Sequence, residues 1–172
     1  MLIVKYFIKL FKTLQSDDRP QDIARGFVLG MVMGLTPLMS LHNLIFLILI
    51  FILRAHLSMA ILGIGVFSIL GFILDPLFQS IGYSVLTMES LQGLWTDLYN
   101  TPIIALSMFN NTVVMGSLIV ALIALIPMFY LMIWFVKYYR DNLDEKIKKL
   151  KIVQLVKTSR IYGFYNKFSG GN

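Results

Sequence analysis

The amino-acid sequence predicts an all-α integral membrane protein with interrupted or re-entrant helical hairpins, two or more full crossings, and amphipathic interfacial helices at both ends. Hydrophobic residues make up 58% of the 172 residues and charged residues only 14%, whereas a soluble domain carries about 25% charged residues. The apolar runs 44–53, 57–74 and 113–136 approach or exceed the ~20 residues that span a hydrocarbon core as a helix. Cysteine is absent, which excludes disulfide bonds and thiol catalysis.

Positive charge is concentrated at the two ends of the chain. Between residues 26 and 136 the only base is Arg54, against the three acids Asp75, Glu89 and Asp97. Because short flanks rich in lysine and arginine stay in the cytoplasm, we expect both termini to be cytoplasmic and the acidic segment 87–100 to lie outside. The number of full crossings should then be even.

Three regions follow from this pattern: an N-terminal interfacial helix (1–18), a polytopic membrane domain (19–136) and a basic cytoplasmic tail (137–172). In the first region, Lys5, Lys9 and Lys12 are spaced by four and three residues, which places them on one helical face. A helix of this kind lies in the plane of the lipid headgroups. The N-terminus shows no removable signal peptide, so we expect this helix to stay on the protein.

The membrane domain is expected to begin with a re-entrant hairpin. An acid precedes Pro20, which predicts a capped helix starting around residues 19–21. Residues 26–36 number 11 and form about 16 Å of helix, roughly half of a ~30 Å hydrocarbon core. We therefore expect a turn near Thr36 and Pro37 and a return along residues 38–53 to Arg54, with polar side chains serving the backbone groups freed at the turn.

The rest of the membrane domain reads as a second interrupted half. Residues 57–86 are long enough to cross once but are expected to be broken at Asp75 and Pro76, because proline removes a backbone donor. Trp95 and Tyr99 fit an interfacial stretch, residues 101–112 fit another short arm, and residues 113–136 fit a tilted crossing back. Thr-Pro precedes a short apolar run closed by asparagine in both halves, which is the pattern of an inverted repeat with interrupted helices.

The tail is expected to form a basic amphipathic helix capped by Asp141. Lysines near a membrane surface bind anionic lipid with about 1 kcal/mol each. Nucleic-acid binding is disfavoured, because topology already explains a basic flank beside a spanning helix. The expected contacts with lipid headgroups are Lys5, Lys9, Lys12, Lys146 and Lys149.

Glycines recur every four residues in the first arm and predict close helix packing. Gly26, Gly30 and Gly34 fall on nearly one helical face and let another backbone approach. With Pro37 and Pro76 they form the predicted packing set. Packing within the hairpin is the expected role of this face, and a dimer interface or a groove for an acyl chain is the alternative.

Polar residues within the apolar runs are the candidates for a functional site. Asp75 is expected either to pair with Arg54 or His56 along a proton or ion path, or to cap a half-helix opened by Pro76. A central polar pocket, with half-helices starting at the two Thr-Pro sites and facing an anion, competes with simple hydrogen bonding at the hairpin tip. The candidate polar membrane site comprises Thr36, His42, Asn43, Arg54, His56, Asp75, Asn110 and Asn111.

The stretches "RPQDIARGFVLGMVMGLTPLMSLHN" and "AILGIGVFSILGFILDPLFQSIGYSVL" resemble a bacterial inner-membrane family known as domain of unknown function 2062. The resemblance covers about residues 19–136, and Asp75 stands where the family has asparagine. It implies a small polytopic membrane protein and no particular reaction. Some relatives resemble appendages to glycosyltransferases or parts of envelope gene clusters. The residues that match the family pattern are Pro20, Ala24, Gly26, Gly30, Gly34 and Pro37.

The sequence contains no nucleophile with a base, no phosphate-binding glycine loop and no carboxylate pair, and two histidines alone cannot close a zinc site. We therefore expect no enzyme, no cofactor and no metal.

The leading expectation is a multi-pass protein of the bacterial inner membrane that serves as a subunit or partner of an envelope or lipid-transport assembly. Its expected partners are anionic headgroups and a membrane or envelope protein, with a homodimer as a further alternative. The competing functions are a small secondary transporter or channel-like protein with inverted interrupted repeats, in which Asp75 couples to protons, and a membrane accessory of a glycosyltransferase.

Overall fold

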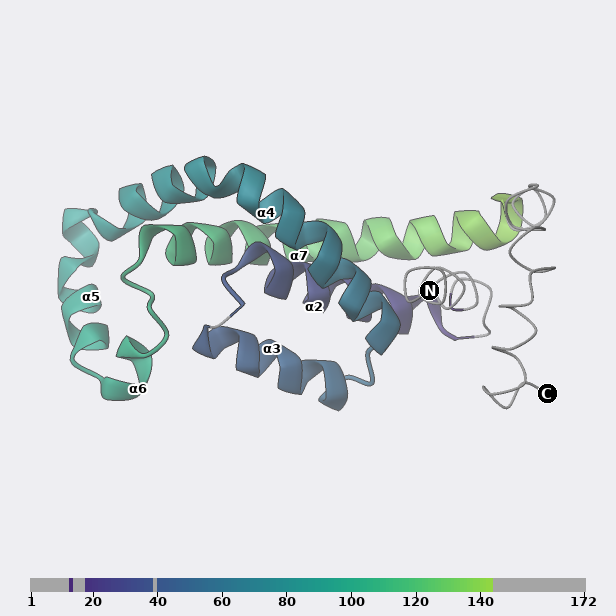
Figure 1. The fold of residues 1–172 in the computed structure, drawn as a ribbon, viewed down its shortest axis with the longest axis horizontal. Helices are drawn as coiled ribbons and strands as arrows, with labels where there is room; N and C mark the ends of the chain where they lie inside the picture. Colours follow the sequence, from purple (N-terminus) through teal and green to yellow (C-terminus); the bar gives the residue numbers. More distant parts are fainter. Residues whose placement is uncertain (1–12, 14–17, 39, 144–172) are drawn as a thin grey trace. The chain divides into compact units, whose positions relative to one another are not determined.

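The computed structural model describes residues 13, 18–38 and 40–143, and within them every regular element is helical. Residues 19–133 form one compact unit, apart from gap residue 39, and the described residues 13, 18 and 134–143 belong to a second unit. The five lysines predicted to contact headgroups, and most of both predicted interfacial helices, lie outside the described residues. The elements are α2 (Pro20–Leu35), α3 (Leu41–Ile52), α4 (Leu57–Leu86), a 3-10 turn (Glu89–Leu91), α5 (Gln92–Tyr99), α6 (Pro102–Ala105), α7 (Thr112–Tyr138) and a π-helical turn (Tyr139–Leu143) (Figure 1).

Helix α2 begins at Pro20, as the sequence predicts, but the expected acidic cap is wrong. The N-cap is Arg19, which makes no side-chain capping bond. The acid in the first turn, Asp22, instead accepts charge-assisted hydrogen bonds from Arg19 Nε at 2.9 Å and from Arg25 Nη1 at 2.7 Å. A carboxylate in the first turn also interacts favourably with the positive end of the helix dipole.

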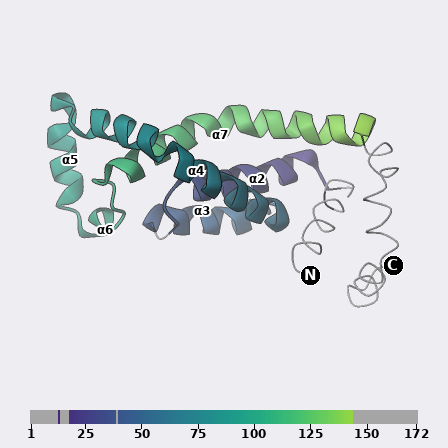
Figure 2. The same ribbon diagram turned by 45° about the horizontal axis from the view of Figure 1, so that its top comes forward.

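Helices α2 and α3 form a hairpin whose two open ends meet. The chain turns back between Thr36 and Ser40, and α3 lies beside α2 (Figures 1 and 2). At the base of the hairpin the Asp22 carbonyl accepts the His56 N–H at 3.1 Å, and Arg25 Nη1 lies 3.5 Å from the Leu53 carbonyl. The hairpin therefore starts and ends at the same level of the molecule.

Glycines bring α2 and α4 into backbone contact. The two helices run in the same direction, because successive glycines of α2 meet successive residues of α4. A Cβ atom at any of these glycines would collide with a carbonyl group of α4, for example at 2.7 Å from the Ile64 oxygen at Gly34. Close approach of this kind is what small residues permit in membrane helices. The facing pairs are Gly26 with His56, Gly30 with Ala60, and Gly34 with Ile64. The expectation that this glycine face packs within the hairpin is therefore wrong, because α4 and not α3 lies against it.

A second glycine contact joins α4 to α7. A Cβ atom at Gly82 would collide with the Thr112 carbonyl, and one at Gly116 would collide with the Phe78 carbonyl. Phe78 of α4 meets Gly116 of α7, whereas the later residue Gly82 meets the earlier residue Thr112. The two helices are therefore antiparallel here. Helix α4 thus packs its first half on α2 and its second half on the start of α7.

The predicted break at Asp75 and Pro76 is wrong. Helix α4 runs without interruption through Pro76 over 30 residues, and it is visibly curved (Figure 1). A proline inside a helix removes one hydrogen bond and either kinks or breaks the helix. Here the glycine contacts hold α4 on both sides of the proline.

The second short arm is also not observed as expected. In place of an arm over residues 101–112, the structure has α6 with four residues, followed by turns that lead to α7. Four residues of helix are only about 6 Å long. Within the described residues, the long hairpin of α2 and α3 therefore has no counterpart in the second half, and the interpretation as two equivalent halves is not supported.

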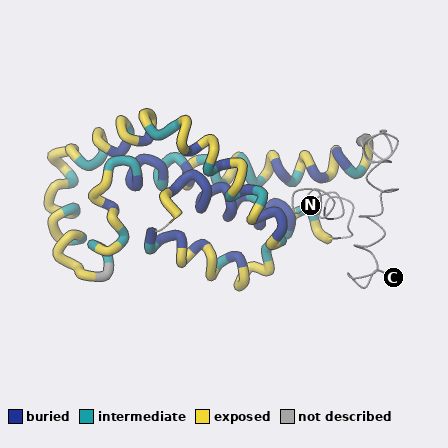
Figure 3. The backbone as a smooth tube through the Cα atoms, in the orientation of Figure 1, coloured by how far each residue is buried: buried dark blue, intermediate teal, exposed yellow. Residues whose placement is uncertain are grey.

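The core is centred on α2, and the outer faces of the other long helices are apolar and exposed. Figure 3 shows the buried run along α2 and exposed stretches along α3 and α4. In α2, Ile23, Met31 and Val32 are fully buried, while Phe72 of α4 is 80% exposed. Two helical segments, Leu57–Leu86 and Thr112–Asn142, are long and apolar enough to cross a membrane.

Candidate functional site

The tip of the hairpin gathers the predicted polar residues of the first half. Thr36 is in an extended conformation, as expected for a residue before proline, and its hydroxyl lies 2.9 Å from both the Val32 carbonyl and the Asn43 Oδ1. The amide of Asn43 donates to the Pro37 carbonyl at 2.9 Å and lies 3.4 Å from the Leu38 carbonyl. Asn43 therefore satisfies backbone groups that the turn leaves without helical partners.

Ser40 completes the tip. Its hydroxyl donates to the Pro37 carbonyl at 2.7 Å, and its own carbonyl accepts the Asn43 N–H at 3.0 Å. Thr36, Ser40 and Asn43 are all buried. Their hydrogen-bonding capacity is used within the turn, so the tip is built as a closed structural motif.

His42 lies next to this network but outside it. It is 9% exposed, and its Nε2 is buried without a hydrogen-bond partner among the described residues. A neutral imidazole has one donor and one acceptor nitrogen. Nothing in the described part of the chain assigns a role to Nε2.

Arg54 and His56 lie at the opposite end of the hairpin, at its base. His56 is the N-cap of α4 and makes no side-chain capping bond there. Arg54 is exposed and has a positive φ of 49°. Their separation from the tip by the length of α3 excludes a single pocket formed by all eight predicted residues.

Asp75 does not pair with Arg54 or His56. It is half-buried within the continuous α4, and the 18 residues that separate Leu57 from it correspond to about 27 Å of helix. The ion pairs found among residues 18–38 and 40–143 join Asp22 to Arg19 and Arg25. The expected capping role of Asp75 is also wrong, because no helix begins at Pro76.

The two asparagines before α7 have different surroundings. Asn111 caps the helix: its Oδ1 accepts the N–H groups of Val113 at 2.9 Å and Val114 at 3.3 Å. Such a cap satisfies donors that the first helical turn leaves free. Asn110 instead lines a cleft.

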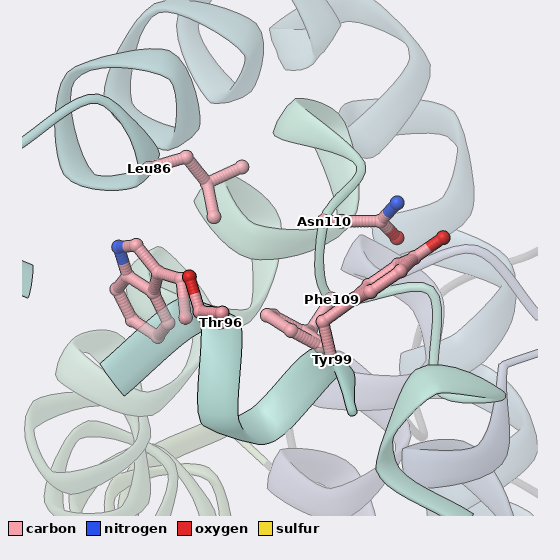
Figure 4. Close-up of a pocket in the computed structure, with 6 residues that line it drawn as sticks. Leu86, Thr96, Tyr99, Phe109 and Asn110 are labelled. Atoms are coloured by element: carbon pink, nitrogen blue, oxygen red, sulfur yellow. The ribbon is translucent and has the colours of Figure 1, made fainter. Parts of the chain in front are cut away.

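This cleft is a wide, open depression with a volume of about 300 Å³, and it lies where α4 ends and α7 begins. Trp95 and Phe109 are in ring contact at 6.1 Å between centroids, and Trp95 Nε1 donates to the Val85 carbonyl at 3.3 Å. Sequence reasoning treated Trp95 and Tyr99 only as interfacial anchors and did not identify the cleft, because Phe109 approaches them only through the fold. The cleft is lined by Leu86, Trp95, Thr96, Tyr99, Phe109 and Asn110 (Figure 4).

We expected a half-helix to begin at each of the two Thr-Pro sites, and the structure shows a helix start at only one of them. Helix α3 begins at Leu41, four residues after Pro37, whereas α6 does begin at Pro102 but has only four residues. Within the described ranges, no three histidine, aspartate or glutamate side chains gather as a metal site.

Comparison with protein families matches residues 5–143 to the model of an uncharacterised protein conserved in bacteria, DUF2062. A protein of Treponema pallidum (strain Nichols), described as "Uncharacterized protein", is 26% identical over 157 residues, which cover 91% of this chain and 97% of that protein. No solved structure matches the chain.

Proposed function

The chain belongs to the DUF2062 family of bacterial proteins, and we propose that it is a non-catalytic inner-membrane protein that holds lipid or a partner protein within an envelope or lipid-transport assembly. The observation that carries this proposal is the α2–α3 hairpin. Its tip is closed by its own hydrogen bonds, and its outer arm presents a continuous apolar face.

Membrane insertion is supported by the exposed surface. Soluble proteins rarely expose apolar patches larger than a few hundred Å², yet the outer sides of three helices are apolar here. No lysine or arginine occurs between residues 55 and 136 to interrupt them. The exposed residues of α3 alone are Leu44, Ile45, Leu47, Ile48, Phe51 and Ile52.

The helix lengths support a hairpin that enters the bilayer and returns. Helix α4 has 30 residues, about 45 Å, which matches the ~40–45 Å of a bilayer with its headgroups. Helix α2 has 16 residues, about 24 Å, and its end at Leu35 meets Gly71, near the middle of α4. Non-helical backbone at this depth requires partners inside the protein, and Asn43 and Thr36 provide them.

A binding role fits the different surroundings of the two arms of the hairpin, α2 and α3. Helix α2 is buried on almost all sides, so it fixes the hairpin to α4, whereas α3 keeps an unpacked face toward the bilayer. Alternating access in inverted-repeat transporters is the rocking of one interrupted half against another, and the described residues show a continuous α4 and only a four-residue α6 in place of a second interrupted half. The arrangement therefore favours a holding role over transport.

Photocrosslinking tests this proposal. A photoreactive residue in place of Ile48, on the exposed face of α3, should capture one lipid class or one membrane protein above background in native membranes. The control position is Ile69, which is 68% exposed on α4. Capture of bulk lipid in equal amounts at both positions would contradict a binding role for the hairpin.

The transporter alternative has its own test at Asp75. Replacing Asp75 by Asn should leave partner capture at Ile48 unchanged if the protein holds a ligand. A proton-coupled transporter would instead lose coupled flux in the same variant.

A further inference from the structure

The cleft at the end of α4 lies in a part of the chain that carries only negative charge. Glu89 and Asp97 are both exposed in the segment 87–111 that joins α4 to α7, and this segment has no lysine or arginine. Asp97 follows Thr96, which lines the cleft. Because exposed carboxylates attract cations and repel anions, the cleft is suited to a cationic group and not to a bare phosphate.

Three of the six residues that line the cleft are aromatic. Tyr99 is 58% exposed and Phe109 is 9% exposed, and the side chains of Tyr99, Phe109 and Asn110 come close together at one side of the opening (Figure 4). Aromatic faces attract ammonium groups through the ring quadrupole, most strongly at tryptophan. A volume of about 300 Å³ is at the small end of ligand pockets and suits a single headgroup.

Hydrogen bonds from α5 to the end of α4 hold these walls in place. Gln92 Nε2 donates to the Leu86 carbonyl at 2.9 Å, and Trp95 Nε1 donates to the Val85 carbonyl at 3.3 Å. Both carbonyls lie in the last turn of α4, where helical donors run out; the Val85 carbonyl also accepts the Met88 N–H at 3.4 Å. The cleft is therefore formed before a ligand arrives, which lowers the entropy lost on binding.

The position of the cleft indicates where its ligand comes from. Leu86 is the last residue of α4, and Asn110 lies two residues before α7 begins. If these helices cross the bilayer, as the proposed function requires, the cleft lies at headgroup depth, where tryptophan and tyrosine are enriched. We propose that it binds the ammonium headgroup of a phospholipid such as phosphatidylethanolamine, in the leaflet opposite the base of the hairpin.

Tryptophan fluorescence tests this inference directly. The chain has two tryptophans, so Trp134→Phe leaves Trp95 as the only indole. The full chain with this substitution, in detergent, is titrated with dihexanoyl-phosphatidylethanolamine, dihexanoyl-phosphatidylglycerol and free ethanolamine. We expect a saturable change with phosphatidylethanolamine and affinity at least about tenfold weaker for phosphatidylglycerol, which lacks the ammonium group, in line with a cation–π contribution.

Variants of Tyr99 provide the matched comparison, because its exposure makes misfolding a small risk. Tyr99→Leu keeps an apolar side chain but removes the ring, and it should weaken phosphatidylethanolamine binding about tenfold. Tyr99→Phe keeps the ring and should change binding less than about threefold. Equal binding of both lipids, or a Tyr99→Leu variant that binds like the parent, overturns the proposal.

Free ethanolamine separates the two sources of an ammonium group. Binding as tight as that of the lipid would assign the cleft to a soluble amine and overturn the lipid assignment. The proposed function is tested at Ile48 on another helix, so a failure there leaves the titration at Trp95 interpretable, and the reverse also holds.

Discussion

Arg54 occupies a backbone position that normally belongs to glycine. Helix α3 ends in a Schellman motif: the Ala55 N–H bonds to the Ile50 carbonyl at 2.9 Å, and the Arg54 N–H bonds to the Phe51 carbonyl at 3.2 Å. The left-handed residue of this motif is the one directly after the C-cap; here the C-cap is Leu53, and Arg54 follows it with a φ of 49°. The left-handed region costs a non-glycine residue roughly 1–2 kcal/mol, so this position retains an arginine at the expense of stability.

Substitutions of Arg54 should distinguish the energetic cost of its left-handed backbone from the contribution of its side-chain charge. Arg54→Gly should stabilise the detergent-solubilised protein by about 1 kcal/mol relative to Arg54→Ala, measured by thermal unfolding, because only glycine relieves the left-handed conformation. Arg54→Lys is the control that keeps the charge. Equal unfolding temperatures for the glycine and alanine variants would show that the backbone is not left-handed at this residue.

Asn43 and Asn111 differ in how they use their side-chain amide groups. Asn43 needs its N–H₂ group for the Pro37 carbonyl, whereas Asn111 uses only its oxygen as the cap of α7. Asn111→Asp should therefore be tolerated, while Asn43→Asp should lose about 1–3 kcal/mol, since a buried carboxylate has no N–H to donate and would face the Pro37 carbonyl oxygen instead. Denaturant unfolding of the two variants side by side checks the difference. Similar losses for both would argue against the tip network.

At the scale of elements, two sets of glycines bring α4 into backbone contact with its neighbours, alongside buried large side chains such as Phe67 and Phe78. Gly30 faces the Ala60 carbonyl, and Gly116 faces the Phe78 carbonyl. Backbone contact of this kind gives dispersion and weak Cα–H bonds over a long interface. It also explains why α4 stays continuous through its proline.

Alanine substitutions should distinguish glycines that contact another backbone from a glycine that does not. Gly30→Ala and Gly116→Ala should each destabilise the protein by about 1–3 kcal/mol, because a methyl group would push two backbones apart. Gly65→Ala should be neutral or stabilising by up to ~1 kcal/mol, since nothing lies within 4 Å of a Cβ atom there. Thermal stability in one detergent measures all three. A loss at Gly65 comparable to that at Gly30 would contradict the helix pairing.

At the scale of the whole molecule, the absence of cysteine makes the membrane arrangement directly measurable. Single cysteines introduced at Leu53, at the base of the hairpin, and at Gly93, in α5, should be labelled from opposite sides of intact cells or inverted vesicles. A cysteine at Leu38, at the hairpin tip, should be protected from water-soluble reagents on both sides. Labelling of Leu38 from the same side as Gly93 would show that the first arm crosses the membrane and would refute the hairpin.

The sequence alone predicted the helical class, the start of α2 near Pro20 and the turn at Thr36 and Pro37. These features depend on local chemistry: proline fixes φ and lacks a donor, and apolar run length sets helix length. The same local logic failed at Pro76, because whether proline breaks or only bends a helix depends on what holds the turns beside it. The predicted arm over residues 101–112 was wrong for a similar reason. A Thr-Pro pair and an apolar run do not determine how many of the following residues become helical.

What only the tertiary structure decided is which distant residues meet. The spacing of Gly26, Gly30 and Gly34 indicated a packing face, which was expected to pack within the hairpin. The structure places α4 against it instead. The polar candidates likewise separate into tip, base, mid-α4 and the start of α7, because side chains that are 20 residues apart on one helix are ~30 Å apart in space. The aromatic cleft had no sequence signal, since Trp95 and Phe109 come together only after α4 and α7 have paired.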